Sequence, residues 1–459
     1  MTRAAESMTP IAEAQGSRSP VRRVLLLLMF IVLLIDNLPG AGLGIGPGMS
    51  AKNLCLYLLI IMIGMRATTS PSGVRFVDLN VHVPFLVLIL YAITTWAMAS
   101  IFDPTYNSLK GAVTLKNQLV DYYLFWFAFC YGVERKEDFL WLIRAIVVIM
   151  MVISLLTLLD FLNIPDLGIV GTYKGRLEGP FGAANQYGAL QAFLLPLSIA
   201  MAPAGGGFLR RWSWRIGIFI IAALLIATGS RGAYLATVVG GGLGVFYLRR
   251  FLDMRTVART AGAIFISAIV LLTIFAIFNY EFLAERFGKT TSGDIYSASS
   301  GRIEIWTAAL LVMIEWPMSF LFGYGWNAYA ASGIWKAAHN EYLDKLFEMG
   351  VIGLTLFFIV LAAVPMAVRD VLDKVSETER RILLGFIFGM LMISIDVFFV
   401  ALPDTWPVIW IVAGLATGLT ASYRRTETEA KVAATAAGSG QAMRKQQRAI
   451  GTAAFRAGS

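Results

Sequence analysis

The residues best suited to chemistry gather in one segment, residues 322–354, of an otherwise apolar chain. The segment reads FGYGWNAYAASGIWKAAHNEYLDKLFEMGVIGL and contains His339, one of only two histidines in the sequence. A neutral imidazole is well suited to accepting a proton near pH 7, and a place at the start of a helix favours its neutral form. His339 is therefore the candidate general base. The alternative is an interfacial histidine that only caps a helix or makes a hydrogen bond.

Two arginines are candidates for binding an anion. Arg302 stands in SSGRIEIW at the start of a predicted helix, where its guanidinium and the free backbone N–H groups would meet at one anion. Arg231 lies in TGSRGAYL between two apolar runs, with no acidic residue beside it in the sequence. A diphosphate suits such a site. The alternative for Arg231 is an arginine that extends along apolar surface to reach water.

A polar loop rich in glycine adds possible contacts to a sugar or a phosphate. The loop reads TYKGRLEGPFGAANQYG, follows the fifth apolar run and contains Arg176 and Asn185. Asn340 and Tyr342, which follow the candidate base, are further possible substrate contacts. The alternative for the loop is a simple turn between two membrane segments.

The sequence predicts neither a metal site nor a cofactor. It contains no DxD, HExxH or Walker motif, and its two cysteines, Cys55 and Cys130, lie inside apolar runs. We interpret both cysteines as small buried hydrophobic residues. The charge of a diphosphate would therefore be balanced by arginines.

The amino-acid composition indicates that the candidate functional residues are positioned by membrane helices. Hydrophobic residues make up 58% of the chain and charged residues 15%, which excludes an ordinary soluble domain. Only helices and closed barrels satisfy the backbone in lipid, so we predict an all-α polytopic transmembrane bundle. With roughly 20 residues needed for a crossing, the apolar runs indicate about twelve spans. They lie at 24–41, 53–65, 83–102, 111–132, 139–162, 186–203, 214–229, 232–248, 259–280, 350–368, 382–400 and 405–422.

The distribution of basic residues predicts the orientation. The net charge of +9 arises mostly from Lys and Arg residues that flank the hydrophobic segments, so it indicates membrane topology and not nucleic-acid binding. The more basic side, with both termini, is assigned to the cytosol. We predict a disordered cytosolic leader at 1–21, a transmembrane domain at 22–422 with a large outer loop at 281–349, and a basic, disordered cytosolic tail at 423–459.

Two predicted helices position the candidate base and Arg302. The first is an amphipathic helix over 301–316, at or in the membrane interface. Its apolar stripe consists of Ile303, Trp306, Leu310 and Met313. The second is one continuous helix over 340–368, about 43 Å long at 1.5 Å per residue. Because this exceeds the ~30 Å hydrocarbon core, its first turns, with His339, are expected to project into the outer compartment.

Acidic and small residues inside the predicted spans receive structural interpretations. A charged side chain is costly in lipid. For four acidic residues we therefore favour ion pairing or a position at a helix end over a role in proton-coupled transport. They are Asp36, Asp121, Asp160 and Asp396. The glycines at 240–242 and 244 indicate close helix packing. They do not form a nucleotide loop, which would follow a strand.

Three short patterns resemble motifs of the O-antigen ligase and polymerase superfamily. They are, in chain order, Arg231-x3-Leu235, GRIEIW around Arg302, and His339-Asn340-x9-Gly350-x2-Gly353. The second is similar to a Gly-Arg-x-x-x-Trp motif early in the large outer loop of that family, and the third to its His-Asn motif. The predicted topology, with a large outer loop before the last three spans, agrees with the family over most of the chain.

The resemblance implies a GT-C-like membrane glycosyltransferase that uses an undecaprenyl-diphosphate-linked glycan. It implies that His339 deprotonates an acceptor sugar hydroxyl, that Arg231 and Arg302 hold the diphosphate, and that the glycan moves en bloc with inversion at its anomeric carbon. It implies no metal and no cofactor. It also places the protein in the bacterial inner membrane, with its active site on the periplasmic face.

The resemblance leaves the acceptor open. A ligase, which passes the glycan to the lipid A core, is placed first because two large arginine-rich outer loops, a feature of polymerases, are not found. The alternatives are a polymerase of O-antigen or exopolysaccharide repeats, with a lipid-linked repeat as acceptor, and transfer to Ser or Thr of a protein. The competing class is a transporter or flippase of lipid-linked sugars. It predicts pseudo-symmetry between the halves, which the sequence does not display, and leaves His339 without a role.

Overall fold

The computed structural model describes most of the chain between residues 20 and 428. The described residues are 20–35, 44–46, 48–69, 80–133, 135–164, 167–168, 170–173, 176–203, 207–278, 301–334 and 336–428, with the single residues 280, 284, 288 and 299. The predicted leader at 1–21 lies almost entirely outside this set, as does the tail beyond residue 428. The same is true of nearly all of the outer loop before residue 301.

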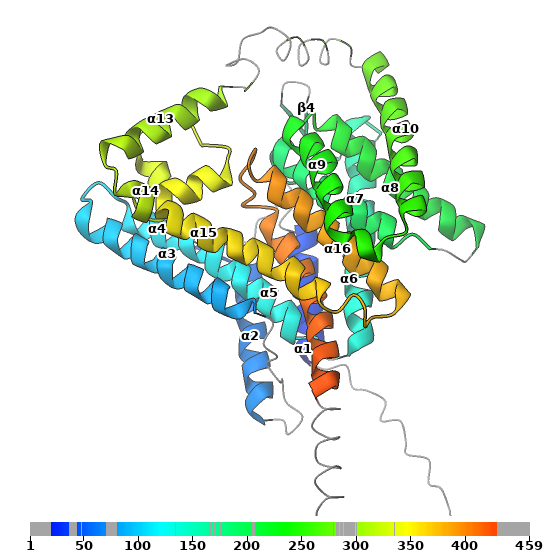
Figure 1. The fold of residues 1–459 in the computed structure, drawn as a ribbon, viewed down its shortest axis with the longest axis horizontal. Coiled ribbons are helices and arrows are strands. Elements are labelled where there is room, and N and C mark those ends of the chain that lie inside the picture. The colour runs from blue at the N-terminus through cyan, green and yellow to red at the C-terminus, as the bar shows by residue number, and fades with distance from the viewer. Residues whose placement is uncertain are drawn as a thin grey trace, which may run out of the picture.

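The chain forms a bundle of α-helices, as the composition predicts (Figure 1). The first half contains α1 (Pro20–Phe30) with a π-helical continuation (Ile31–Ile35), α2 (Ala51–Thr69), α3 (His82–Phe102), α4 (Ser108–Leu115), a π-helical link (Lys116–Val120), α5 (Asp121–Tyr131), α6 (Lys136–Phe161) and α7 (Ala184–Ala200). The second half contains α8 (Phe208–Ala227), α9 (Arg231–Leu248), α10 (Met254–Phe278), α13 (Arg302–Glu315), α14 (Ser319–Phe322), α15 (Glu341–Arg369), α16 (Glu377–Asp396) and a C-terminal helix (Trp406–Thr428). Two antiparallel hairpins are small additions, β1 (Gly44–Gly46) with β2 (Met49–Ser50) and β3 (Gly171–Tyr173) with β4 (Arg176–Gly179).

Six helices in the described part of the chain are long and apolar enough to cross a membrane. They are Ala51–Thr69, His82–Phe102, Lys136–Phe161, Met254–Thr273, Glu341–Arg369 and Trp406–Thr428. Other predicted spans coincide with helices that are shorter, such as α7, or carry more charge, such as α16. The membrane character of the bundle is therefore supported, and the number of about twelve spans stays a prediction.

The C-terminal helix is the centre of the bundle. Within its apolar window 89% of the residues are buried. Two glycines allow α5 to approach it closely, because a Cβ at Gly414 would lie 2.5 Å from the carbonyl oxygen of Trp126 and one at Gly418 would lie 2.7 Å from that of Cys130. The helix extends to Thr428, beyond the predicted end of the transmembrane domain at residue 422.

Helix α16 is packed between α7 and α9 through small residues on both sides. A Cβ at Gly389 would lie 2.8 Å from the carbonyl oxygen of Phe193 in α7, and a Cβ at Gly240 in α9 would lie 2.7 Å from the Cα of Met392. Gly244, one turn along α9, abuts Phe388 in the same way. This confirms the predicted close packing for Gly240 and Gly244, whereas a Cβ at Gly242 would meet nothing within 4 Å. The position of α16 is thus fixed along most of its length.

The predicted helix at 301–316 is confirmed as α13, but its buried stripe differs from the predicted one. The buried residues are Ile305, Ala309 and Met313, whereas Leu310 is exposed. The stripe is displaced because Ile305, Ala309 and Met313 join an apolar cluster that includes Ala338, in the segment leading to α15. Its first residue, Arg302, follows Gly301, which has a left-handed φ of 77°.

The predicted continuous helix over 340–368 is wrong at one point. Helix α15 is kinked at Gly350, whose φ of 64° and ψ of −170° are not helical. The kink turns two carbonyl groups toward the preceding loop, where the N–H of Tyr324 donates to Phe347 at 2.9 Å and that of Gly325 to Glu348 at 2.9 Å. The loop before the candidate base is therefore anchored to the first half of α15.

Candidate functional site

The C-terminal end of α16, residues 394–399, is the point where the candidate residues meet. Helix α15 contacts this end of α16, because the N–H of Glu341 donates to the carbonyl of Val397 at 2.8 Å. The hydroxyl of Tyr342 donates to the carbonyl of Ser394 at 2.5 Å. These two bonds fix the start of α15, and with it His339, against the end of α16.

Helix α13 reaches the same place through one tryptophan. The ring of Trp306 packs edge-on against Phe398 with centroids 5.4 Å apart, and its indole N–H donates to the carbonyl of Ala338 at 2.8 Å. Trp306 lies four residues after Arg302, so both side chains are on one face of the helix. This gives a physical reason for the Gly-Arg-x-x-x-Trp spacing: the tryptophan holds the residue before His339 while the arginine stands at the helix start.

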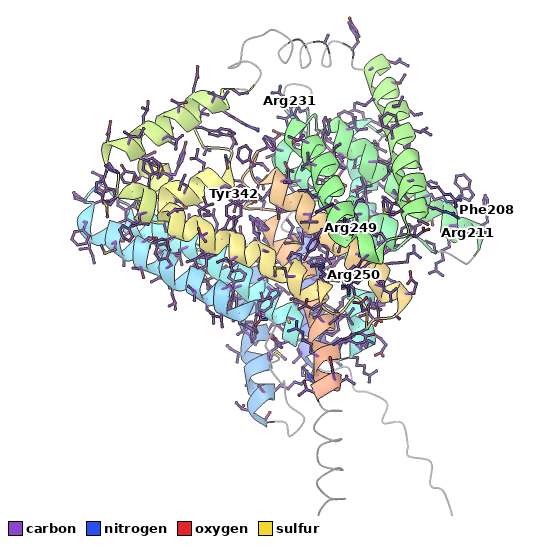
Figure 2. The ribbon with its side chains drawn as sticks, viewed as in Figure 1. Phe208, Arg211, Arg231, Arg249, Arg250 and Tyr342 are labelled. Carbon is purple, nitrogen blue, oxygen red and sulfur yellow. The ribbon has the colours of Figure 1, made fainter. Side chains whose placement is uncertain are left out.

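Helix α9 completes the arrangement. A Cβ at Gly232 would lie 2.6 Å from Cβ of Phe399 and 3.0 Å from Oδ1 of Asp396, so only glycine allows this approach. Arg231 precedes it as the first residue of α9, and Ser230 caps the helix by accepting a hydrogen bond from the N–H of Ala233 at 3.3 Å. Figure 2 shows Arg231 at the end of α9 opposite to Arg249 and Arg250.

The starts of α9, α13 and α15 therefore surround one end of α16. Each helix start carries a partial positive charge of roughly half a unit, and two of the three begin with an arginine. The structure thus brings Arg231, Arg302 and His339 to one place, although long stretches of sequence separate them. Chemically, such a place is suited to an anion with two charged groups.

His339 has a strained backbone and a lowered pKa. Its φ is +50°, in the left-handed region that residues other than glycine seldom adopt. Although His339 is exposed, partial desolvation by the surrounding protein lowers the pKa of the imidazole, and the positive charges of Arg302 and Lys336 lower it further. A lowered pKa favours the neutral imidazole at pH 7, the form that a general base needs.

Asp396 belongs to the site, and sequence reasoning did not include it. Both of its carboxylate oxygens are buried, and neither has a hydrogen-bond partner among the described residues. The charge of Arg302 acts on it, and Gly232 lies against it. The sequence placed Asp396 only among four acids in predicted spans, with no pattern to distinguish it from the other three.

Arg176 and Asn185 form a pair beside the start of α9. The guanidinium of Arg176 donates to Oδ1 of Asn185 at 2.5 Å and to the carbonyl of Thr228 at 2.9 Å. Thr228 ends α8, just before the turn that leads to Arg231. The hairpin β3–β4 thus holds Arg176 next to this turn, and its contact with a substrate stays a prediction.

Asn340 and Tyr342 have structural roles in this conformation. The side chain of Asn340 is buried and caps α15 by accepting a hydrogen bond from the N–H of Leu343 at 3.1 Å. The ring of Tyr342 packs against Phe358 with centroids 4.6 Å apart, and its hydroxyl bonds to α16. Both residues position the segment of His339, and their contact with a substrate stays a prediction.

The first turns of α15 are enclosed by other parts of the protein, and their projection into the outer compartment stays a prediction. Glu341, Lys345 and Glu348 are all buried. The ammonium of Lys345 lies 3.1 Å from Oε2 of Glu348 and 3.9 Å from the centre of the Trp326 ring. Glu341 accepts a hydrogen bond at 3.0 Å from the indole of Trp406. Sequence reasoning missed this cluster, whose one signal is the spacing that places the three side chains on one helix face.

Fold and site together define a class: a helical membrane protein in which three helix starts converge around a histidine and two arginines. Residues 216–358 match the family model described as O-antigen ligase, and this segment includes all three sequence patterns. This match confirms the resemblance to the O-antigen ligase and polymerase superfamily, whose members are membrane glycosyltransferase-like enzymes. No curated protein shows a significant match to the chain.

Proposed function

We propose that this protein is an inverting, metal-independent glycosyltransferase that moves an undecaprenyl-diphosphate-linked glycan en bloc to the lipid A core. The observation that carries the proposal is the convergence of Arg231, Arg302 and His339 at the end of α16. In this proposal the site offers an anion two guanidinium groups and, next to them, a neutral base. A diphosphate ester whose reacting carbon lies beside the base matches this pattern.

The two arginines stabilise the leaving diphosphate. Negative charge grows on its bridging oxygen as the bond to the sugar breaks, and fixed guanidinium groups and helix starts stabilise that charge without reorganisation. Arginine presents a planar set of donors that matches phosphate oxygens. The charge of Arg302 also acts on the buried carboxyl group of Asp396.

His339 acts as the base. An unprotonated ring nitrogen accepts the proton of an acceptor hydroxyl while the oxygen attacks the anomeric carbon. The bond from that carbon to the diphosphate breaks on the opposite side, so the configuration inverts and undecaprenyl diphosphate leaves with both electrons. The lowered pKa keeps the imidazole ready for this step at neutral pH.

The site faces the periplasm in this proposal, with both termini in the cytosol and the protein in the bacterial inner membrane. Supporting evidence comes from the helix ends far from the site. Helix α9 runs from Arg231 to the end where Arg249 and Arg250 lie (Figure 2). Helix α15 ends at Arg369. Basic residues thus gather at the ends opposite to the site, and the positive-inside rule assigns those ends to the cytosol.

The acceptor is settled by assay. Full-length protein in nanodiscs is given carrier-linked glycan together with either lipid A core or additional carrier-linked repeat, and released undecaprenyl diphosphate is measured. We expect release with lipid A core. Release only with the carrier-linked repeat would make the protein a polymerase, the alternative in the same superfamily. Absence of release with any acceptor, combined with movement of the lipid across the bilayer, would make it a transporter.

The mechanism is tested with two histidine variants. His339→Gln is expected to lower turnover about 100-fold or more while carrier lipid still binds, because general-base catalysis contributes that much. His82→Gln is the matched control, since His82 is the other histidine and contacts the hydroxyls of Tyr123 and Tyr131 away from the site. Equal turnover in wild type and His339→Gln would refute His339 as the base.

A further inference from the structure

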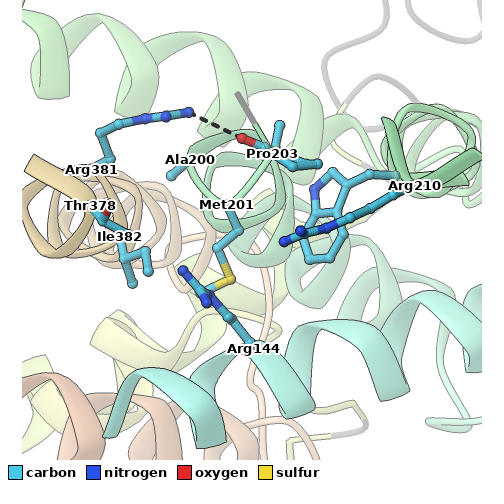
Figure 3. Close-up of a pocket in the computed structure, with 10 residues that line it drawn as sticks. Arg144, Ala200, Met201, Pro203, Arg210, Thr378, Arg381 and Ile382 are labelled. Atoms are coloured by element: carbon cyan, nitrogen blue, oxygen red, sulfur yellow. Dashed lines mark hydrogen bonds between the residues drawn. The ribbon is translucent and has the colours of Figure 1, made fainter. Parts of the chain in front are cut away.

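A second basic site lies at the far end of the bundle from His339. It is a pocket of about 230 Å³ between α6, the connection from α7 to α8, and the start of α16 (Figure 3). Its volume is several times the roughly 30 Å³ that a water molecule occupies in the liquid. The pocket can therefore hold a group of the size of a phosphate ester.

Three arginines line this pocket, from three different helices. They are Arg144 in α6, Arg210 in α8 and Arg381 in α16. Figure 3 shows Arg144 and Arg210 extending into the same space, while Arg381 crosses toward the α7–α8 connection and donates to the carbonyl of Ala202 at 3.4 Å. The remaining lining residues include no Asp or Glu.

The charges in this pocket lack a balancing carboxylate. Among the described residues, none of the three arginines makes an ion pair with an acidic side chain. Arg144 is also the single basic residue inside the apolar part of α6, where charge is costly. Three guanidinium groups that line one cavity repel each other, and an anion with several oxygens removes that cost.

The surroundings of the pocket favour a lipid as the source of the anion. The outward faces of α6 and α8 next to it are apolar and exposed, with Val148 and Val152 on α6 and Ile216 and Phe219 on α8. Val148 follows Arg144 by one turn on the same helix face. A ligand with an anionic head and apolar chains would contact both the pocket and these faces, whereas a soluble anion would use the pocket alone.

We propose that the pocket of Arg144, Arg210 and Arg381 binds the phosphate group of an anionic membrane lipid. This site is separate from that of the proposed glycosyl transfer, and its occupancy requires no glycan. The headgroup neutralises the three guanidinium groups, and the chains cover α6 and α8. Because the arginines come from three helices, a bound lipid ties α6, α8 and α16 together at the basic end of the bundle.

The proposal is tested by lipid competition on the full-length protein. The protein in detergent is offered equal amounts of phosphatidylglycerol and phosphatidylcholine, and retained lipid is counted by native mass spectrometry. We expect wild type to retain phosphatidylglycerol at least about tenfold over phosphatidylcholine, the factor that one charged hydrogen bond supplies. The triple variant Arg144→Gln, Arg210→Gln, Arg381→Gln is expected to lose this preference, and Arg144→Gln alone to weaken it.

Matched controls separate the pocket from general surface charge. Arg211→Gln removes an exposed arginine next to Arg210 that does not line the pocket, so it should retain the wild-type preference (Figure 2). Thermal unfolding of each variant shows that it is folded, and Arg144→Gln provides the test where the triple variant is unstable. Equal retention of phosphatidylglycerol by wild type and Arg144→Gln would overturn the proposal.

A second arm identifies the source of the phosphate. Inorganic phosphate and glycerol phosphate are added without lipid, and the unfolding temperature is measured. Stabilisation that requires phosphatidylglycerol and vanishes in the triple variant supports the lipid. Equal stabilisation by the soluble phosphates, with no lipid preference, would overturn the lipid as ligand and assign the pocket to a soluble phosphate ester.

Discussion

Replacement of Gly350 by alanine is expected to detach the loop before His339 from α15. The φ of +64° and ψ of −170° at Gly350 fall in a region that essentially only glycine occupies. A Cβ at this position would lie 2.5 Å from the backbone nitrogen of Phe322 and would also overlap the carbonyl of Leu321. Both neighbours are backbone atoms, so neither can move aside as a flexible side chain would.

The loss of stability expected for Gly350→Ala follows from these contacts. The strained backbone contributes about 1–3 kcal/mol. Relief of the overlap separates the loop from the kink and breaks the hydrogen bonds from Tyr324 to Phe347 and from Gly325 to Glu348, each worth about 1 kcal/mol. Gly350→Ala should therefore destabilise the protein by about 3–5 kcal/mol. The motif glycine of the His-Asn-x9-Gly pattern thus holds the loop that leads to the base.

The assay combines stability, local exchange and turnover in nanodiscs. Gly350→Ala should unfold at a lower temperature, exchange the amide hydrogens of Tyr324 and Gly325 faster, and lose glycosyl transfer. Gly242→Ala is the matched control, because its Cβ would meet nothing within 4 Å and alanine favours the helix. Wild-type exchange at Tyr324 and Gly325 in a Gly350→Ala protein that unfolds like the control would refute the reasoning.

Three further predictions concern His339 and its neighbours. Lys336→Gln removes one of the positive charges that lower the pKa of His339, so this pKa should rise. The acid side of the pH–turnover profile, measured from pH 5 to 8, should then move to higher pH. An unchanged profile would contradict this prediction. Trp306→Phe keeps the ring and loses the indole hydrogen bond beside His339, and a turnover about tenfold lower, with carrier-lipid binding retained, is expected. Asn340→Ala should lower the free energy of unfolding by about 0.5–2 kcal/mol, because the side chain that caps α15 is lost. Asn340→Asp should lower it by less, because aspartate can still cap the helix. Equal losses in the two variants would argue against the capping role.

The backbone of His339 connects these predictions to the chemistry. Its left-handed φ costs about 1 kcal/mol and persists because neighbours on both sides hold the chain. The carbonyl of Ala338 accepts from Trp306, and Asn340 caps α15. Weakening either neighbour lets the histidine relax to an ordinary conformation and turns its ring away. The lower turnover expected for Trp306→Phe therefore results from displacement of the His339 ring and not from a change in its proton affinity.

The sequence by itself determined properties that depend on neighbouring residues. Hydropathy over roughly 20 residues at a time predicted the helical membrane character. The spacing of α13 predicted a helix at 301–316, and the small residues of α9 predicted close packing against another helix. Short patterns around Arg231, Arg302 and His339 indicated the superfamily, because each pattern reflects one local requirement, such as an arginine at a helix start.

Only the tertiary structure decided which helix ends meet. Arg231, Arg302 and His339 converge because α9, α13 and α15 all pack against the end of α16, and these contacts join residues far apart in the chain. The same packing buried Asp396 at a place where the charge of Arg302 acts on it. Hydropathy and spacing are local quantities and carry no information on such contacts, which depend on the shapes that glycines and tryptophans create between helices.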